Sequence, residues 1–130
     1  MDFNLKTGIS GSDSLIVSIA DTATHYGSGL IEVFATPAMI GLMEKTAQSS
    51  IQHYLPEGFI TVGTEVNITH VKATPLGMKV ICTSELIGVD GKKLLFKVSA
   101  HDETGLIGEG THKRYIVNAA EFMQKLKSGK

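Results

Sequence analysis

A hydroxyl, a carboxylate and an imidazole stand out in this 130-residue chain as side chains that could do chemistry together: Thr36, Glu44 and His70. Attack on a carbonyl carbon needs a nucleophile or base, a group that orients it, and hydrogen-bond donors for the oxyanion that develops. These three residue types can supply such a set. Each also has a simpler structural interpretation, which depends on its neighbours in the sequence.

Glu44 fits the pattern around it least well. On a helix, its neighbours four residues before and three and seven residues after are Ile40, Ala47 and Ile51, so its carboxylate lies at the margin of an apolar face. A carboxylate in such a place needs an ion partner or hydrogen bonds. The alternative is a boundary glutamate that reaches water past Gln48, and periodicity alone favours it because buried glutamates are rare.

Thr36 is followed by Pro37, and the pair is typical of a helix start, with threonine as the N-cap and proline in the first turn. The same position suits a catalytic role, because the free N–H groups and the positive dipole end of a helix stabilise a developing anion. At 1.5 Å per residue, Thr36 lies roughly 12 Å along the helix from Glu44. A shared site would therefore need substrate, water or another segment between them.

His70 ends a run of alternating residues that would place it on the apolar face of a strand. A lone histidine at a strand end is more often packed or exposed than catalytic, because it titrates near neutrality anywhere. The residues that follow, 72–75, lead into a turn, so His70 could face a cleft.

The rest of the composition excludes several classes of function. The net charge is −1 and the twelve basic residues are scattered, so we expect no nucleic-acid partner. Cys82 is the one cysteine and the histidines show no ligand spacing, so we expect neither a disulfide nor a metal site. No P-loop, GxGxxG or GxSxG motif occurs. Without an apolar run of about 20 residues or a signal-peptide pattern, the chain is predicted to be cytoplasmic, with no membrane partner.

The elements that must position these side chains follow from hydrophobic periodicity and turn signals. We expect strands over 14–20 and 30–35, a helix from 37 to about 54, strands over 59–73, 78–89, 93–103 and 106–117, and a final helix over 119–127 capped by Asn118. The long helix is predicted to bury one broad face: Ile40, Met43, Ala47, Ser50, Ile51 and Tyr54. On strand 59–73, five residues are predicted to lie on one face: Ile60, Val62, Thr64, Val66 and Ile68. After the hairpin at 90–91, four residues should point inward: Leu94, Phe96, Val98 and Ala100.

At this length the chain is predicted to form a single domain, 1–130. Two strands, a long apolar helix and a run of long antiparallel strands make an α+β architecture in which the helix covers one face of the sheet. This is the order of the hotdog fold, a twisted antiparallel sheet wrapped around one long central helix. The hydrophobic content of 42% fits further burial in a homodimer.

Two segments resemble the fluoroacetyl-CoA thioesterase-like family of hotdog proteins. They are 35–44, Ala-Thr-Pro-Ala-Met-Ile-Gly-Leu-Met-Glu, and 61–70, Thr-Val-Gly-Thr-Glu-Val-Asn-Ile-Thr-His. The likeness extends from the first strand through Tyr115. As a set, the helix-start Thr-Pro with a glutamate eight residues on, together with the Val-Gly-Thr…His strand, is fairly specific.

The resemblance implies that Thr36, Glu44 and His70 form a site at a dimer interface, where the chain hydrolyses acyl-CoA thioesters. It further implies that Gly63 offers backbone contacts near the thioester and that Arg114 helps to hold the coenzyme A portion. Coenzyme A enters as part of the substrate, and no other cofactor is implied. Glu44 would act as a base on water or attack directly, and His70 would orient it and share protons. Whether Thr36 attacks or positions water stays open.

One stretch departs from the family pattern. The member that rejects acetyl-CoA has lid phenylalanines before the helix, whereas 26–30 here is Tyr-Gly-Ser-Gly-Leu. We therefore expect a different small or medium acyl group. Two alternatives stay open: a non-catalytic acyl-CoA-binding module on the same fold, and a hydratase or dehydratase, for which the sequence has no Asp-x-x-x-x-His helix signature.

Overall fold

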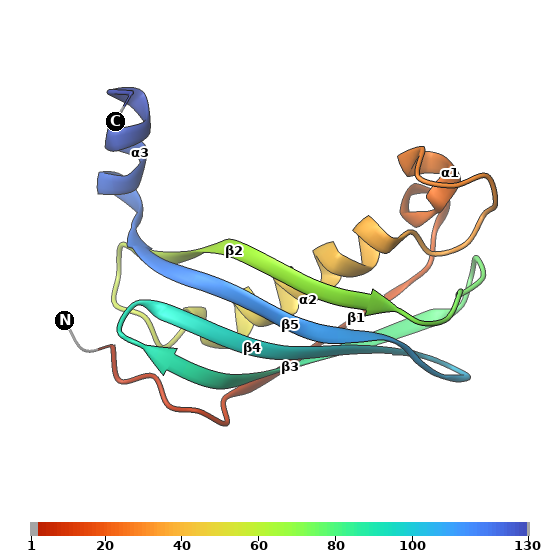
Figure 1. Cartoon of the computed structure of the whole chain (residues 1–130), viewed down its shortest axis with the longest axis horizontal. Helices are drawn as coiled ribbons and strands as arrows, with labels where there is room; N and C mark the ends of the chain where they lie inside the picture. Colours follow the sequence, from red (N-terminus) through yellow and green to blue (C-terminus); the bar gives the residue numbers. More distant parts are fainter. Residues whose placement is uncertain (1–2, 130) are drawn as a thin grey trace.

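The computed structural model describes residues 3–129, which form a five-stranded antiparallel sheet with a long helix across one face (Figure 1). The elements in chain order are β1 (Ser10–Ile16), η1 (Ile19–Asp21), α1 (Ala23–Tyr26), α2 (Thr36–Gln52), β2 (Phe59–His70), β3 (Lys79–Asp90), β4 (Lys93–Asp102), β5 (Gly105–Asn118) and α3 (Ala119–Lys127). The strands lie in the order β1-β3-β4-β5-β2. The predicted α+β architecture, with a sheet curved around one long helix, is confirmed.

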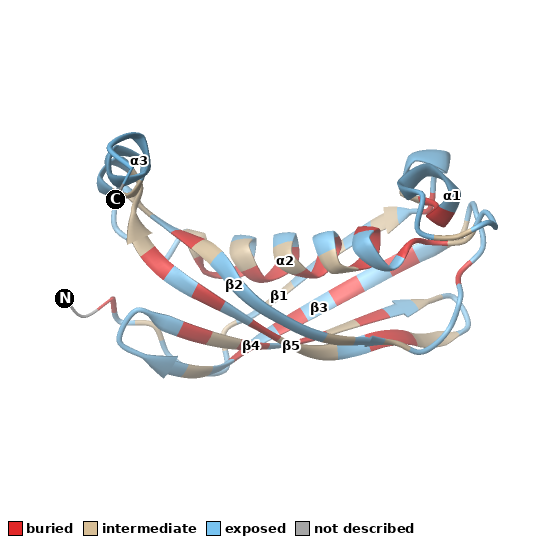
Figure 2. Ribbon diagram, turned by 45° about the horizontal axis from the view of Figure 1, so that its top comes forward, coloured by how far each residue is buried: buried red, intermediate tan, exposed pale blue. Residues whose placement is uncertain are grey.

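Helix α2 buries the side that faces the sheet and leaves its other side partly exposed (Figure 2). Its buried residues are Ala38, Met39, Leu42, Met43, Thr46, Ala47, Ser50 and Ile51. This face is turned slightly from the predicted one, since Ile40 is only partly buried. Tyr54 lies beyond the helix end and is 48% exposed, so its predicted burial is wrong. Glu44 is partly buried at the margin of the face, as the periodicity predicted.

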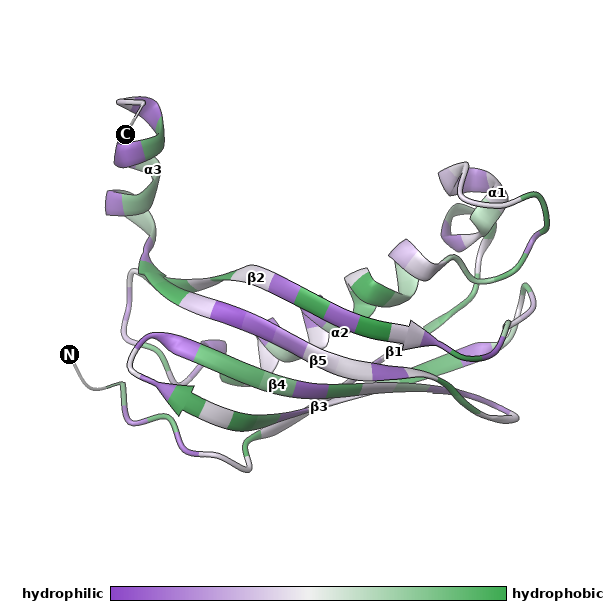
Figure 3. Ribbon diagram, in the orientation of Figure 1, coloured by the Kyte–Doolittle hydropathy of each residue, from purple (hydrophilic) through white to green (hydrophobic). Residues whose placement is uncertain are grey.

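Strands β3, β4 and β5 form the predicted meander and supply the sheet's share of the core. The hairpin between β3 and β4 is confirmed, with Gly91 in the left-handed conformation (φ 61°) that a tight turn needs. Figure 3 shows hydrophobic and hydrophilic residues following one another along β4. The four β4 residues predicted to point inward are each at most 1% exposed: Leu94, Phe96, Val98 and Ala100. Cross-strand pairing with this buried strand fixes the register of β5, with His112 opposite Phe96 and Arg114 opposite Leu94.

The first strand begins and ends earlier than predicted, at Ser10–Ile16 instead of 14–20. Its backbone pairs with β3 from Ser10 onward, where small polar residues give no apolar alternation to detect. A Cβ at Gly11 would lie 2.6 Å from Ser50 Cβ on α2, so the glycine lets β1 pass close to the helix.

Residues 30–35 do not form the predicted strand. They take part only in isolated bridges, which pair Thr22 with Phe34 and Val33 with Pro75. Their apolar side chains divide between the core and solvent, since Phe34 is 1% exposed and Leu30 is 97% exposed. The apolar content that suggested a strand therefore reflects two buried residues, Phe34 and Ala35, at the end of an open loop between α1 and α2.

Strand β2 lies at the edge of the sheet, paired with β5 and not with β3, which follows it in the chain. Its register shifts between Gly63 and Glu65, so that Thr64 is an extra residue in the ladder. This β-bulge reverses the alternation that the sequence predicts for the strand.

Before the bulge, the odd-numbered residues of β2 face the helix. Thr61 is 6% exposed, whereas Ile60 is 38% exposed, so the predicted inward face is wrong in this half. After the bulge the even-numbered residues lie on the predicted side of the strand. Ile68 packs partly buried against the core, Val66 stays 45% exposed at the sheet edge, and His70 contacts Thr36 at the start of α2. The bulge therefore lets Gly63 and His70 both face the helix from one strand.

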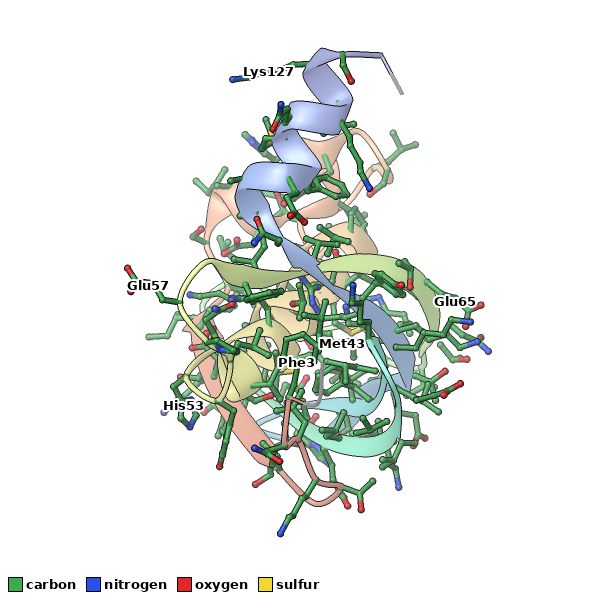
Figure 4. The ribbon with its side chains drawn as sticks, turned by 90° about the vertical axis from the view of Figure 1, so that its left-hand side faces the viewer. Phe3, Met43, His53, Glu57, Glu65 and Lys127 are labelled. Carbon is green, nitrogen blue, oxygen red and sulfur yellow. The ribbon has the colours of Figure 1, made fainter. Side chains whose placement is uncertain are left out.

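The prediction for the last helix, α3, is confirmed. Asn118 caps it, with its Oδ1 accepting a hydrogen bond from the backbone N–H of Glu121 at 3.1 Å. The helix projects from the end of the sheet and carries Lys127 away from the core (Figures 1 and 4). Within residues 3–129, no helix is long and apolar enough to cross a membrane.

Candidate active site

Thr36 and His70 are in direct contact at the N-terminus of α2, with Thr36 Oγ1 2.8 Å from His70 Nδ1. The N-cap position belongs to Ala35, whose backbone is extended (φ −74°, ψ 142°), and Thr36 is the first residue of the helix. The prediction that Thr36 caps the helix is therefore wrong. Because Ala35 occupies the cap position, the Thr36 hydroxyl is directed to the end of β2 instead.

The second ring nitrogen of His70, Nε2, is buried and has no hydrogen-bond partner among the described residues. Burial lowers the pKa of His70, an effect that the backbone of Lys72 partly offsets. The imidazole of His70 therefore stays neutral down to a lower pH than an ordinary histidine does. One nitrogen bonds Thr36, and the other is able to bond a bound molecule.

Thr36 and His70 line a cleft of about 560 Å³ beside the segment that joins α1 to α2. Its lining residues are Ala23, Ser28, Val33, Phe34, Thr36, His70, Val71, Lys72 and Ala73. Lys72 supplies a positive charge here, although its Nζ also lies 3.9 Å from Asp102 Oδ1. Apolar walls with a hydroxyl, an imidazole and a helix N-terminus suit a ligand that carries a carbonyl group.

A second hollow, of about 540 Å³, lies over the hairpin end of β3 and β4. Lys93 and Lys113 are among its lining residues, together with Arg114. Thr36, Glu44 and His70 do not line it. The chemistry-bearing side chains therefore favour the first cleft as the candidate active site.

Glu44 directs its carboxylate at the bare backbone of Gly63. A Cβ at Gly63 would lie 2.9 Å from Glu44 Oε2, 3.2 Å from His112 Cε1 and 3.3 Å from Arg114 Nη1. The carboxylate and guanidinium atoms are thus at most 6.2 Å apart, the sum of the two distances. Glycine at this position leaves room for three polar groups to approach one another.

Arg114 is 8% exposed, and its guanidinium is held from three directions. Nε donates to Thr61 Oγ1 at 2.7 Å, Nη2 donates to the Thr61 carbonyl at 3.0 Å, and Nη1 donates to His112 Nε2 at 3.0 Å. Burial lowers the pKa of Arg114 and the negative charge of Glu44 raises it. An arginine keeps its charge in proteins, so Glu44 faces a fixed buried cation.

His112 belongs to the same group, although its spacing from the other histidines does not single it out. It is 1% exposed, and its Nδ1 lies 2.8 Å from the carbonyl oxygen of Glu65. One signal in the sequence could have found it: His112 and Arg114 are two residues apart on a strand and so share a face.

The predicted site residues form two groups within one chain. Thr36 and His70 meet at the start of α2, and Glu44 meets Gly63 and Arg114 farther along it. Eight helical residues put the two groups roughly 12 Å apart along the axis. In the described part of the chain no hydrogen bond joins them, and no three His, Cys, Asp or Glu side chains are arranged to hold a metal ion.

Comparison with known proteins bears on both the fold and the chemistry. The fluoroacetyl-CoA thioesterase of Streptantibioticus cattleyicolor is 43% identical over 96 residues, which are 74% of this chain and 69% of that protein. A solved structure of the fluoroacetyl-CoA thioesterase FlK has a TM-score of 0.89 at 34% identity, and the match covers 98% of each chain. A hot-dog-like protein from Thermanaerovibrio acidaminovorans has a TM-score of 0.90 at 28% identity, with 98% of this chain and 96% of that chain covered.

These structural matches confirm the hotdog fold. Residues 17–120 match the family model described as fluoroacetyl-CoA-specific thioesterase, which confirms the resemblance seen in the sequence. The matched span contains both groups of candidate residues, from Thr36 to Arg114. The chain therefore belongs to the fluoroacetyl-CoA-specific thioesterase family, a family of hotdog-fold thioester hydrolases.

Proposed function

We propose that the chain hydrolyses an acyl-CoA thioester with Thr36, His70 and Glu44 as its catalytic residues. The observation that supports this most is the 2.8 Å contact between Thr36 Oγ1 and His70 Nδ1 in a cleft at a helix N-terminus. The hydroxyl and the neutral imidazole make a nucleophile–base pair. The helix N-terminus stabilises the negative charge that develops on the thioester oxygen.

In the proposed reaction, an oxygen attacks the thioester carbonyl carbon and the carbon–sulfur bond breaks. The neutral imidazole of His70 takes the proton of the attacking oxygen and returns it to the leaving thiolate, so that coenzyme A departs as a thiol. The attacking oxygen is Thr36 Oγ1 or a water bound to it. If Thr36 attacks, Glu44 takes a proton from the water that then cleaves the acyl-Thr36 ester, and that proton returns to Thr36 Oγ1 as the free acid leaves. If the water attacks, it yields the free acid directly, and Glu44 orients it. An acyl-Thr36 adduct detected by mass spectrometry after rapid quenching would assign the attack to Thr36.

The substrate that we propose carries a small or medium acyl group other than fluoroacetyl. Leu30 is the last residue of the 26–30 stretch, which lacks the lid phenylalanines, and it is 97% exposed. The neighbouring Ser28 and Val33 line the cleft, so this loop lies where it can touch an acyl chain. The family resemblance implies that Arg114 helps to hold the CoA portion. The contacts of its guanidinium with Thr61 and His112 also support a role beside Glu44.

We propose further that the chain works as a homodimer paired through β2. This strand is at the sheet edge and is exposed throughout 63–67, so its free backbone groups can pair with a second copy. A two-fold axis through this stretch runs the two β2 strands antiparallel. It brings the His70 end of one strand toward residues 60–63 of the other. The Thr36–His70 pair of one subunit then faces Glu44 of the partner subunit.

Release of free thiol from a panel of short, branched and aromatic acyl-CoAs tests the activity. We expect Thr36→Val, His70→Gln and Glu44→Gln to lose it, whereas His53→Gln and Glu57→Gln keep it, since these two side chains point away from the core (Figure 4). No release above background from any acyl-CoA would refute the thioesterase proposal. If the protein binds CoA esters tightly without release, it is a non-catalytic binding module.

Mixing inactive Thr36→Ala and Glu44→Ala chains tests the shared site. If each site takes Thr36 from one subunit and Glu44 from the other, half of randomly mixed dimers carry one intact site, and about a quarter of wild-type activity returns. A site built within one chain would give no recovery. Sedimentation at the same concentrations establishes the dimer independently. The cytoplasmic location remains a prediction from the sequence.

A further inference from the structure

His112 is a buried titratable residue to which the proposed reaction gives no step, yet both of its nitrogens are engaged. Its Nε2 lies 3.0 Å from Arg114 Nη1, and its Nδ1 lies 2.8 Å from the carbonyl oxygen of Glu65. A guanidinium nitrogen can only donate and a carbonyl oxygen can only accept. The two partners therefore require the same form of the ring: neutral, with the proton on Nδ1 and the lone pair on Nε2.

The surroundings of His112 oppose its protonation. A proton on Nε2 would face the N–H of Arg114 and place two positive charges side by side. Burial lowers the pKa of His112, and so does the charge of Arg114, while the Glu65 carbonyl and the Glu44 carboxylate act in the opposite direction. The ring of Phe96 packs near the imidazole, with centroids 6.5 Å apart, and adds no charge.

The β-bulge in β2 supplies the acceptor that orients His112. Regular pairing with β5 resumes after the bulge, with Glu65 opposite Lys113 and Val66 opposite His112. The Glu65 side chain lies at the periphery of the molecule (Figure 4), where its Oε2 is 3.6 Å from Lys113 Nζ. Only the backbone carbonyl of Glu65 reaches inward, so the bulge sets the ring orientation of His112.

We propose that His112 is a positioning residue that acts on Glu44 through Arg114. Thr61 holds one side of the guanidinium, and the lone pair of His112 takes Nη1. Without that acceptor, Nη1 turns to Glu44, whose Oε2 is at most 6.2 Å away. A direct Glu44–Arg114 ion pair then forms and draws the carboxylate out of its working position. This inference rests on the proposed role of Glu44.

Two substitutions separate the contacts of His112. His112→Gln places an amide oxygen near the position of Nε2 and can still accept from Arg114. His112→Asn places an amide nitrogen near the position of Nδ1 and can donate to the Glu65 carbonyl, but it leaves Arg114 without its acceptor. We expect His112→Gln to keep kcat within about threefold and His112→Asn to lower kcat at least about tenfold, with KM nearly unchanged in both.

Thermal unfolding of both variants is the control. Equal losses of kcat in the two variants, or losses that follow their melting temperatures, would mean that His112 only packs the core and would overturn the proposal. A test independent of activity is the long-range ¹H–¹⁵N NMR spectrum of the wild-type protein at pH 7. It should show a protonated Nδ1 and an unprotonated Nε2 for His112, and any other form overturns the proposal even if no acyl-CoA is ever hydrolysed.

Discussion

Replacing Gly63 by alanine tests whether the position of the Glu44 carboxylate limits catalysis. The new Cβ would lie 2.9 Å from Glu44 Oε2, whereas ordinary contacts begin near 3.4 Å. The carboxylate must therefore retreat by about 0.5 Å or more, and a misplacement of about 1 Å can cost about 100-fold in rate. We expect kcat/KM to fall between about 10-fold and about 100-fold in the thiol-release assay.

The same substitution should leave the fold almost unchanged. The nearest obstacle, Glu44 Oε2, is the end of a flexible side chain, and His112 Cε1 at 3.2 Å and Arg114 Nη1 at 3.3 Å need to give only one or two tenths of an ångström. Gly63 does not have a positive φ. Alanine also restricts the unfolded chain, which stabilises by about 0.4–1 kcal/mol. The free energy of unfolding, measured with urea, should thus stay within about 1 kcal/mol of wild type. Gly88→Ala is the matched control, because its Cβ would meet Leu95 at 3.4 Å and should leave activity intact. Full activity in Gly63→Ala, or a loss of several kcal/mol of stability, would refute the reasoning.

Three further predictions concern pH, the core and the last helix. Because burial lowers the pKa of His70, the acid limb of kcat/KM should lie below the ordinary histidine value of about 6.5, with activity lost as the pH falls through the lowered pKa; a limb above that value would contradict a buried neutral base. Met43→Ala removes a side chain that is 1% exposed and should cost about 2–5 kcal/mol in urea unfolding, while a cost under 1 kcal/mol would mean that the core collapses around the gap. Asn118→Ala should fray α3 by about 1 kcal/mol, seen as faster exchange of the Glu121 amide with no change in thiol release.

The long helix, the β3–β4–β5 meander and α3 can be predicted from the sequence because each has a strong local signal. Leu94 to Ala100 alternate in a strand that is buried on one face, and Asn118 is a side chain that caps within its own segment. The β-bulge has no such signal. Whether Thr64 stays in the ladder depends on β5, which lies some fifty residues later in the chain. The strand order and the inward face of Thr61 depend on that same distant pairing.

The sequence names candidate site residues but does not give their arrangement. The family resemblance selects Thr36, Glu44 and His70, and periodicity places Glu44 at the margin of the buried face. Two features of the site become visible only in the folded structure. Ala35 takes the cap position, which frees the Thr36 hydroxyl for His70, and the guanidinium of Arg114 turns inward to His112. The first depends on the backbone angles of Ala35 and on a contact between residues 34 positions apart, and the second on hydrogen bonds from Arg114 to Thr61, 53 positions earlier in the chain.

The irregular register of β2 has a consequence for the tendency of this protein to aggregate. An exposed edge strand of twelve residues is a template on which other extended chains can add, and Ile60 and Val66 make it adhesive. In the proposed homodimer a second copy covers 63–67, and the extra residue at Thr64 twists the edge so that this pairing stays short and does not continue from copy to copy. Deleting Thr64 would straighten the strand, and the shortened protein should aggregate on dilution or gentle heating where the natural chain stays dispersed, which light scattering would detect. The same irregularity that shapes the interior thus also protects the outside of the sheet from fibrillar growth.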